Sequence, residues 1–233
     1  MSRSILTVTF CLLVTVARAQ NAGAPPSDSP RDTRHLNIAL PELELRGTTP
    51  VMFATLVREA GLSGGVVISN QECSQGQEFS ISVAAGTTLD KALDQVAKVG
   101  TTSGWQVQDR VANLLPVGFV PPLLQVHIHK FEWDRAAPLR EVIDRLRHLP
   151  EVSEGAQRLG LKETPFEGGM SQMCIRGDCT QIPRPEPVPE VEEDATLLSV
   201  LNRIVQAHDH AVWNYSEYRC NKNTQFSLDL MAE

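Results

Sequence analysis

Two pairs of histidines in this chain have a spacing that could bind a metal ion. One residue separates His127 from His129, and one separates His208 from His210. Because side chains at i and i+2 point to the same side of a β-strand, each pair could offer two imidazoles to a zinc ion. The alternative for the first pair is a half-exposed sheet face. For the second it is a helix C-terminus, where histidine is favoured by the helix dipole. We predict no cofactor, and the two histidine pairs are the best metal candidates in the chain.

The cysteines are the next residues with chemical potential. Four lie beyond the N-terminal apolar segment: Cys73, Cys174, Cys179 and Cys220. In an oxidising compartment an even number favours disulfides, and four cysteines allow three pairings. The glycine between Cys174 and Cys179 permits a tight loop, so we expect a Cys174–Cys179 disulfide, accompanied by Cys73–Cys220. A zinc site built from cysteines is the alternative.

Aromatic residues are scarce, at 5% of the chain, and five of them are concentrated in its second half. These five are Phe131, Trp133, Trp213, Tyr215 and Tyr218. Regular alternation would put Phe131 and Trp133 on the same strand face as the first histidine pair. Trp213 and Tyr215 would share a face of a later strand. Core packing is the ordinary explanation for such aromatics. The functional alternative, which gives our candidate binding residues, is a partly exposed strip that binds a partner near a strand edge.

The charge of the chain limits the kinds of partner. The net charge is -7 at pH 7 and the pI is about 5.4. Nonspecific binding of nucleic acid requires clustered lysines and arginines against phosphate, so an acidic chain argues against it. No catalytic motif stands out either. We therefore expect a protein that is not an enzyme and that binds another protein. The alternative is a small periplasmic metal-binding protein or hydrolase that uses the histidine pairs.

The N-terminus has the form of a signal peptide. A single basic residue, Arg3, precedes the apolar run Ile5–Val16, and Ala17-Arg18-Ala19 has the small-x-small pattern read by signal peptidase. The run is too short to span a bilayer, which takes roughly 20 residues. We expect residues 1–19 to be removed, residues 20–34 to be a disordered leader, and the product to be periplasmic or secreted without stable membrane insertion.

A pattern that repeats after 108 positions organises the rest of the chain. Thr88, Leu89, Leu93, Val96 and Trp105 correspond to Thr196, Leu197, Leu201, Ile204 and Trp213. The apolar spacing is that of one helix face, and each tryptophan begins a strand-like segment after its helix. Two copies of a small module are predicted, because a fixed offset of this kind is the signature of a repeat.

Each copy is predicted to contain strand, helix, strand, strand, helix, strand and strand, in that order. Helix starts are expected at Thr49-Pro50 and at Thr87-x-x-Asp90, the latter resembling a capping box. The fold class is therefore α+β, with two tandem βαββαββ modules whose helices pack on short sheets. The first module spans 35–117, and the second spans 123–233 with an insertion at about 150–192 that contains a second helical stretch and a Pro-rich segment.

The first module resembles the secretin and TonB short N-terminal domain, a small α/β module of the Gram-negative envelope. The resemblance rests on Leu43-x-Leu45, Pro50, Gly61-Leu62, Val66-Val67-Ile68, Phe79–Val83, Thr88–Leu93 and Gly104-Trp105-Gln106-Val107. It implies a docking role in the cell envelope, as in a secretin- or TonB-type assembly. Pore formation and siderophore transport do not carry over, because no secretin pore region or outer-membrane barrel follows the module.

Overall fold

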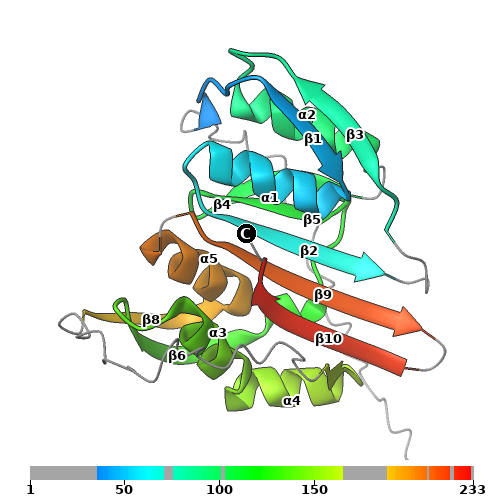
Figure 1. Cartoon of the computed structure of the whole chain (residues 1–233). Helices are drawn as coiled ribbons and strands as arrows, with labels where there is room; N and C mark the ends of the chain where they lie inside the picture. The colour runs from blue at the N-terminus through cyan, green and yellow to red at the C-terminus, as the bar shows by residue number, and fades with distance from the viewer. Residues whose placement is uncertain are drawn as a thin grey trace, which may run out of the picture. The chain divides into compact units, whose positions relative to one another are not determined.

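The first half of the chain folds in the predicted element order (Figure 1). The computed structural model describes residues 36–70, 76–100, 103–164, 188–208, 210–220 and 223–231, which belong to one compact unit. The elements of the first half are β1 (Leu43–Gly47), α1 (Thr49–Glu59), β2 (Gly64–Asn70), β3 (Phe79–Val83), α2 (Leu89–Val99), β4 (Ser103–Gln108) and β5 (Val111–Pro116). The prediction of an α+β fold is confirmed.

The second half follows the same order with one additional helix. A short 3-10 helix, η2, leads into it, and its elements are η2 (Pro122–Gln125), β6 (His127–Asp134), α3 (Leu139–Arg147), α4 (Pro150–Arg158), β7 (Lys162–Glu163), β8 (Pro189–Thr196), α5 (Leu197–Ala207), β9 (Val212–Cys220) and β10 (Asn223–Leu230). The helical stretch expected inside the insertion is α4. The Pro-rich part of the insertion, up to residue 187, lies outside the described residues.

One six-stranded sheet joins the two halves, with the strand order β4-β5-β2-β9-β10-β7. In the first half β4 and β5 form an antiparallel hairpin, and β5 pairs in parallel with the earlier strand β2. In the second half β9 and β10 form an antiparallel hairpin, and β10 pairs in parallel with the earlier strand β7. The halves meet where β2 runs parallel to β9, from the pair Gly64–Val212 to the pair Asn70–Tyr218. The expectation of separate short sheets is therefore corrected, because the central sheet is shared.

The second half is turned over relative to the first. Strand β2 is parallel to both β5 and β9, so β9 runs opposite to β4, its counterpart. The helices of the two halves consequently cover opposite faces of the sheet (Figure 1). Helices α1 and α2 contact both the central sheet and the β1–β3 pair, and α5 contacts both the central sheet and the β6–β8 pair.

Two buried clusters result, one on each face of the sheet. Neighbouring residues of β2 divide between them: Val66 belongs to the cluster that contains Phe53 and Leu93, and Val67 to the cluster that contains Leu201 and Trp213. A strand covered on both faces needs apolar side chains at consecutive positions, and this accounts for the β-branched run in β2. Burial on both faces also stabilises the joint between the halves, at roughly 25 cal/mol for each Å² of apolar surface removed from water.

The tryptophans of the repeated pattern occupy matching positions in the two halves. Trp105 Nε1 in β4 donates a hydrogen bond to Asp94 Oδ1 in α2 at 2.8 Å. Trp213 Nε1 in β9 donates to Asn202 Oδ1 in α5 at 3.0 Å. In both cases the acceptor lies 11 residues before the tryptophan. The same helix–hairpin contact therefore occurs twice, at the offset that the sequence pattern gives.

Helix starts differ slightly from the prediction. The N-cap of α2 is Thr88, not Thr87, and its side chain makes no capping hydrogen bond. The capping box expected at Thr87 and Asp90 is therefore wrong. In α5 the cap is complete, because Thr196 Oγ1 accepts a hydrogen bond from Ser199 N at 3.2 Å. Such a cap stabilises a helix by about 1 kcal/mol.

Candidate functional site

Four of the five aromatic residues predicted to form a binding strip are buried. The exposed fractions are 3% for Phe131, 4% for Trp133, and 0% for both Trp213 and Tyr215. Phe131 and Trp133 lie on β6 and Trp213 and Tyr215 lie on β9, and all four belong to one buried apolar cluster. The strip is therefore a wrong prediction for these four, which belong to the core. Tyr218, at 38% exposed, is the member that a partner can reach.

Tyr215 belongs instead to a polar row on β9 that runs from the buried Tyr215 and Glu217 to the exposed Arg219. Its hydroxyl donates a hydrogen bond to Glu217 Oε2 at 2.8 Å, and Arg219 Nη2 lies 2.7 Å from Glu217 Oε1. Burial, together with the negative charge of Glu217, raises the pKa of Tyr215 well above its ordinary value. The phenol therefore stays protonated at neutral pH and serves as a hydrogen-bond donor that holds the Glu217 carboxylate, which is 2% exposed.

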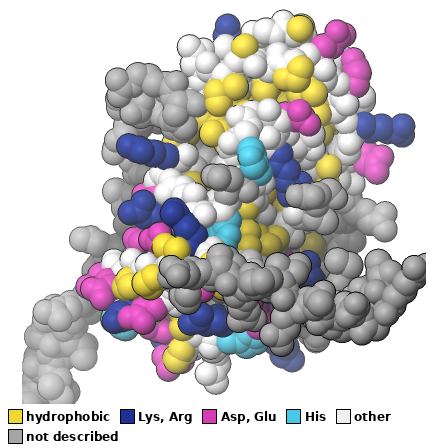
Figure 2. Space-filling model, turned by 60° about the vertical axis from the view of Figure 1, so that its left-hand side comes forward, with side chains coloured by type: hydrophobic (Ala, Val, Ile, Leu, Met, Phe, Trp, Pro, Cys, Tyr) yellow, Lys and Arg dark blue, Asp and Glu magenta, His cyan; other side chains and the backbone are white. Residues whose placement is uncertain are grey.

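The surface carries mixed charges. Figure 2 shows basic and acidic side chains interspersed on one face of the molecule, without a large patch of one sign. On β6, for example, Lys130 Nζ lies 2.5 Å from Glu132 Oε1. Hydrogen bonding between these two groups raises the pKa of Lys130 and lowers the pKa of Glu132. Mixed charges of this kind suit recognition of a protein surface more than of a polyanion.

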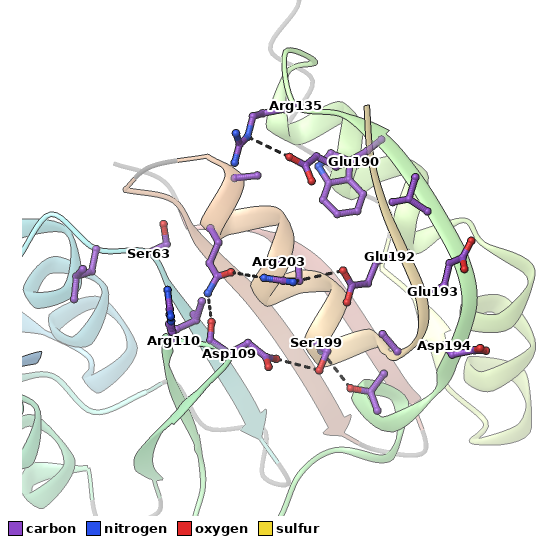
Figure 3. A pocket seen from close by; sticks show the side chains of 18 of the residues that line it. Ser63, Asp109, Arg110, Arg135, Glu190, Glu192, Glu193, Asp194, Ser199 and Arg203 are labelled. Carbon is purple, nitrogen blue, oxygen red and sulfur yellow. Dashed lines mark hydrogen bonds and ion pairs between the residues drawn. The ribbon is translucent and has the colours of Figure 1, made fainter. Parts of the chain in front are cut away.

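An open cleft of about 1180 Å³ lies between the β4–β5 turn, β8 and α5 (Figure 3). Arg110 stands on the turn, Glu190 and Glu192 on β8, and Arg203 on α5. The turn is tied to α5, because Ser199 Oγ donates to Asp109 Oδ2 at 3.1 Å and the Gln206 side chain donates to the Asp109 carbonyl. These bonds link the two halves at the floor of the cleft.

Ion pairs line the far wall of the cleft. Arg203 Nε lies 3.5 Å from Glu192 Oε2, and Arg135 Nε lies 3.7 Å from Glu190 Oε1. Half-exposed pairs at such distances contribute about 0–1 kcal/mol to stability. In each pair the positive charge of the arginine offsets the negative charge of the glutamate.

A serine motif at the cleft was overlooked in the sequence. Gly61-Leu62-Ser63-Gly64-Gly65 matches Gly-x-Ser-x-Gly, which positions the nucleophile of α/β-hydrolases on a strand-to-helix turn. Here the order is reversed, because Ser63 follows α1 and precedes β2. Its hydroxyl donates to the Val205 carbonyl at 2.7 Å. Ser63 therefore ties the first half to the end of α5, and its setting is not that of an activated nucleophile.

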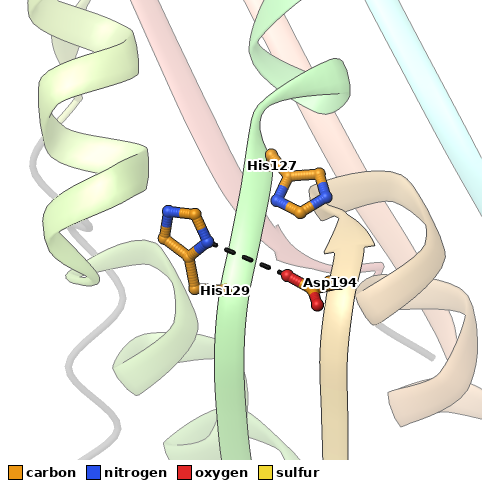
Figure 4. A group of neighbouring side chains, drawn as sticks. All are labelled: His127, His129 and Asp194. Atoms are coloured by element: carbon orange, nitrogen blue, oxygen red, sulfur yellow. Dashed lines mark ion pairs between the residues drawn. The ribbon is translucent and has the colours of Figure 1, made fainter.

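His127 and His129 meet Asp194 on the exposed side of the β6–β8 pair (Figure 4). The potential ligand atoms of the three side chains lie within 4.8 Å of one another. The two imidazole centroids are 5.5 Å apart, and His129 Nδ1 lies 3.9 Å from Asp194 Oδ1. The first predicted pair thus gains a third potential ligand. The sequence did not point to Asp194, because the partner strand of β6 could not be assigned there.

The regular alternation of β6 breaks at this cluster. Ile128 and Phe131 are both buried although they are three positions apart, so His129 and Lys130 between them are both exposed. Across from His129, Asp194 has a φ of 51°, in the left-handed region. Irregular positions in a strand pair re-aim side chains, as β-bulges do. The expectation that Phe131 shares a face with His129 is wrong for this reason.

The second histidine pair does not lie on a strand. His208 is the C-cap of α5, and His210 has a φ of 63° before β9 begins. The i, i+2 geometry assumed for chelation is therefore absent from this pair. The cysteine predictions involve Cys73, Cys174 and Cys179, which lie outside the described residues, and Cys220, whose side chain is likewise not described. Both disulfides stay predictions.

The two edges of the central sheet differ. Strand β7 forms one edge and pairs with β10 through two residues, Lys162 and Glu163. Strand β4 forms the other, and among the described strands it pairs with β5 alone. Residues 103–108 contain no charged residue and no proline. Natural edge strands are usually protected by such residues, so the edge of β4 is open to another strand.

Comparisons with other proteins add no relative to this picture. Neither a family model, nor a curated protein, nor a solved structure matches the chain. Within the described ranges, no helix is both long enough and apolar enough to cross a bilayer.

Proposed function

We propose that this protein is a non-catalytic docking protein, made of two copies of one small module, that binds a protein partner by strand addition at the edge of β4. The proposal places it in the bacterial cell envelope, after export, in a secretin- or TonB-type assembly. The location rests on the N-terminal sequence and on the resemblance of the first module to the secretin and TonB short N-terminal domain. The docking mode rests on the strand pairing described above.

The observation that carries the proposal is the pairing of β2 with β9. By order and pairing, β9 of the second half is the counterpart of β4 in the first. The outer edge of β9 holds β2 in parallel register from Val212 to Tyr218. Among the described strands, none pairs with the same edge of β4. The second half therefore accepts β2 at the outer edge of β9, and the first half presents the equivalent edge, that of β4, to a strand of a partner.

The hydrogen-bonding groups at this edge can be assigned from the turn. Asp109 and Arg110 have φ of 52° and 62°, the combination of a type I′ two-residue hairpin. In such a hairpin the closing pair, Gln108 and Val111, exchanges both hydrogen bonds, and bonded pairs then alternate along the ladder. The backbone N–H and C=O of Val107 consequently point away from β5, toward the outer edge of β4.

Val107→Pro tests the docking mode directly. Proline removes the outward N–H of residue 107 without removing a β4–β5 bond, and edge strands tolerate it at such positions. Val107→Thr keeps both the N–H and the β-branched shape, so it is the matched control. We expect affinity capture from the cell envelope of the producing organism to recover a partner with the wild-type chain and Val107→Thr, and to lose that partner with Val107→Pro.

Amide hydrogen exchange on the recovered complex locates the contact. Partner binding should slow exchange at Val107 more than elsewhere in the described part of the chain. A folded Val107→Pro variant that captures the same partner as wild type would contradict strand addition at β4, as would protection confined to the cleft or to Tyr218.

A further inference from the structure

We propose that His127, His129 and Asp194 form a binding site for a divalent transition-metal ion of the zinc and nickel type. The site is separate from the edge of β4 and does not depend on the docking function. It stands on the meeting of two imidazoles and one carboxylate from two different strands, at a point where the burial alternation of β6 breaks and Asp194 of β8 has a left-handed backbone.

The donor set selects the class of ion. His127 and His129 offer two imidazole nitrogens, and Asp194 offers carboxylate oxygens. Imidazole suits zinc, nickel and copper, whereas calcium and magnesium prefer sites made entirely of oxygen. Two histidines with one carboxylate are a common protein ligand set for zinc, and they leave a further position for water or for a group from outside the chain.

The distances between the ligand atoms allow the three side chains to coordinate one ion. Zinc bonds of roughly 2.0–2.1 Å in a tetrahedron place ligand atoms about 3.3 Å apart. The present atoms lie within 4.8 Å of one another, so an approach of about 1.5 Å completes the site. The side chains of His129 and Asp194 are 78% and 81% exposed, so side-chain rotation is enough to bring them together.

The backbone holds the ligands at the right separation. The pairs Ile128–Ala195 and Lys130–Glu193 flank the site on β6 and β8. Between them, His129 faces Asp194, whose φ of 51° is uncommon for a residue with a side chain. Conformations of this kind persist only when the surroundings determine them, and they cluster at ligand sites. Both side chains are exposed on the side of the strand pair that His127 occupies.

The positive charge of Lys130, which lies next to His129, is offset by neighbouring carboxylates. Lys130 lies next to His129, but its ammonium lies 2.5 Å from Glu132 Oε1 and 3.9 Å from Glu193 Oε1. Two carboxylates therefore offset one ammonium beside the site. The carboxylate of Asp194 adds a further negative charge, so the local field favours a dication.

Calorimetric titration with ZnCl₂, and separately with NiCl₂, tests the site. The untagged full chain is used, with free thiols blocked so that cysteines do not compete. We expect one ion to bind per chain, and His129→Ala and Asp194→Ala to weaken binding by about tenfold or more, since loss of even an outer-shell partner costs 10–100-fold. Absence of binding to wild type, or equal affinity in His129→Ala, would overturn the proposal.

Two further variants separate chelation from other effects. His148→Ala is the matched control, because His148 is also exposed and lies 3.8 Å from a carboxylate of Asp144, without a second histidine there. It should leave zinc affinity unchanged. Asp194→Gly suits the left-handed backbone, so it should keep the melting temperature while zinc affinity falls by about tenfold or more. Loss of binding in His210→Ala but not in His127→Ala would place the ion at the other histidine pair and overturn the proposal.

Discussion

The indole of Trp213 lies in the space that a side chain on Gly65 would need. A Cβ at position 65 would lie 2.1 Å from Trp213 Cε2 and 2.4 Å from Asn113 Oδ1. Gly65 and Trp213 are register partners where β2 of the first half meets β9 of the second. Because Gly65 on β2 has no side chain, the Trp213 ring on β9 can cover the boundary between the two halves.

Gly65→Ala should lower the free energy of unfolding by about 1–3 kcal/mol, the usual range for overpacking in a core. The ring cannot move aside easily, because Trp213 is fully buried and its Nε1 is hydrogen-bonded to Asn202. Urea denaturation measures the loss. Gly104→Ala is the control, since its Cβ would lie 3.7 Å from the nearest atom, an ordinary contact. Equal destabilisation by the two substitutions would contradict the close approach of Trp213 to Gly65.

The sequence predicted best where local periodicity decides the structure. The apolar spacing around Leu93 and Leu201 lies on α2 and α5, and both residues are fully buried. The pairing of β2 with β9 was not predicted, because it joins segments far apart in the chain. A signal was nevertheless present: Val66-Val67-Ile68 has apolar side chains at consecutive positions, which is typical of a strand covered on both faces.

The candidate sites were harder to predict, for two physical reasons. The concentration of aromatics in the second half says nothing of their burial, and Trp213 and Tyr215 proved to be core residues. Asp194 could not be joined to the histidines by spacing, because its position depends on the register of β8 against β6 and on one left-handed residue. Pattern reasoning assumes regular alternation, and ligand clusters often lie where alternation fails.

The two tryptophan hydrogen bonds should differ in strength. Asn202→Ala removes the acceptor of Trp213 Nε1 inside the core, where no water replaces it, because Asn202 is fully buried. The loss should be about 1–3 kcal/mol. Asp94→Ala removes the acceptor of Trp105 Nε1, but Asp94 is exposed and water can take its place. That loss should be about 0.5–1 kcal/mol.

Urea denaturation of both variants checks this difference. The matched positions of the two tryptophans make each variant the control for the other. A larger loss in Asp94→Ala than in Asn202→Ala would show that burial does not determine the strength of this contact.

Tyr215 should make stability depend on pH in the alkaline range. Burial and Glu217 raise the pKa of Tyr215 in the folded state, so the folded chain holds the phenol proton more tightly than the unfolded chain does. The resulting stability is complete below the ordinary tyrosine pKa, near 10, and is lost as pH rises above it. Above that pH, ionisation of Tyr215 should lower the free energy of unfolding by an amount that approaches about 1.4 kcal/mol for each pH unit.

Tyr215→Phe isolates this effect. Other titrating groups are the same in both proteins, so the difference between their urea denaturation curves from pH 8 to 11 belongs to Tyr215. The variant should be less stable at pH 7 by about 1–2 kcal/mol, because Glu217 loses a hydrogen-bond donor in the core. Above pH 10 the difference in free energy of unfolding between wild type and Tyr215→Phe should become smaller. A gap that stays constant up to pH 11 would contradict the raised pKa.

A peptide with the sequence of β2 should bind the open edge of β4. In the chain, residues 64–70 fill the equivalent edge of β9, with Gly65 opposite Trp213. On β4, Trp105 takes the place of Trp213, so a synthetic peptide of residues 62–70 should add in parallel, with its glycine opposite Trp105. Hydrogen exchange should slow at Val107 when the peptide is present. The same peptide with valine in place of Gly65 is the control, because its side chain would collide with an indole held as Trp213 is. Equal protection by the two peptides, or protection by neither, would contradict parallel strand addition at this edge.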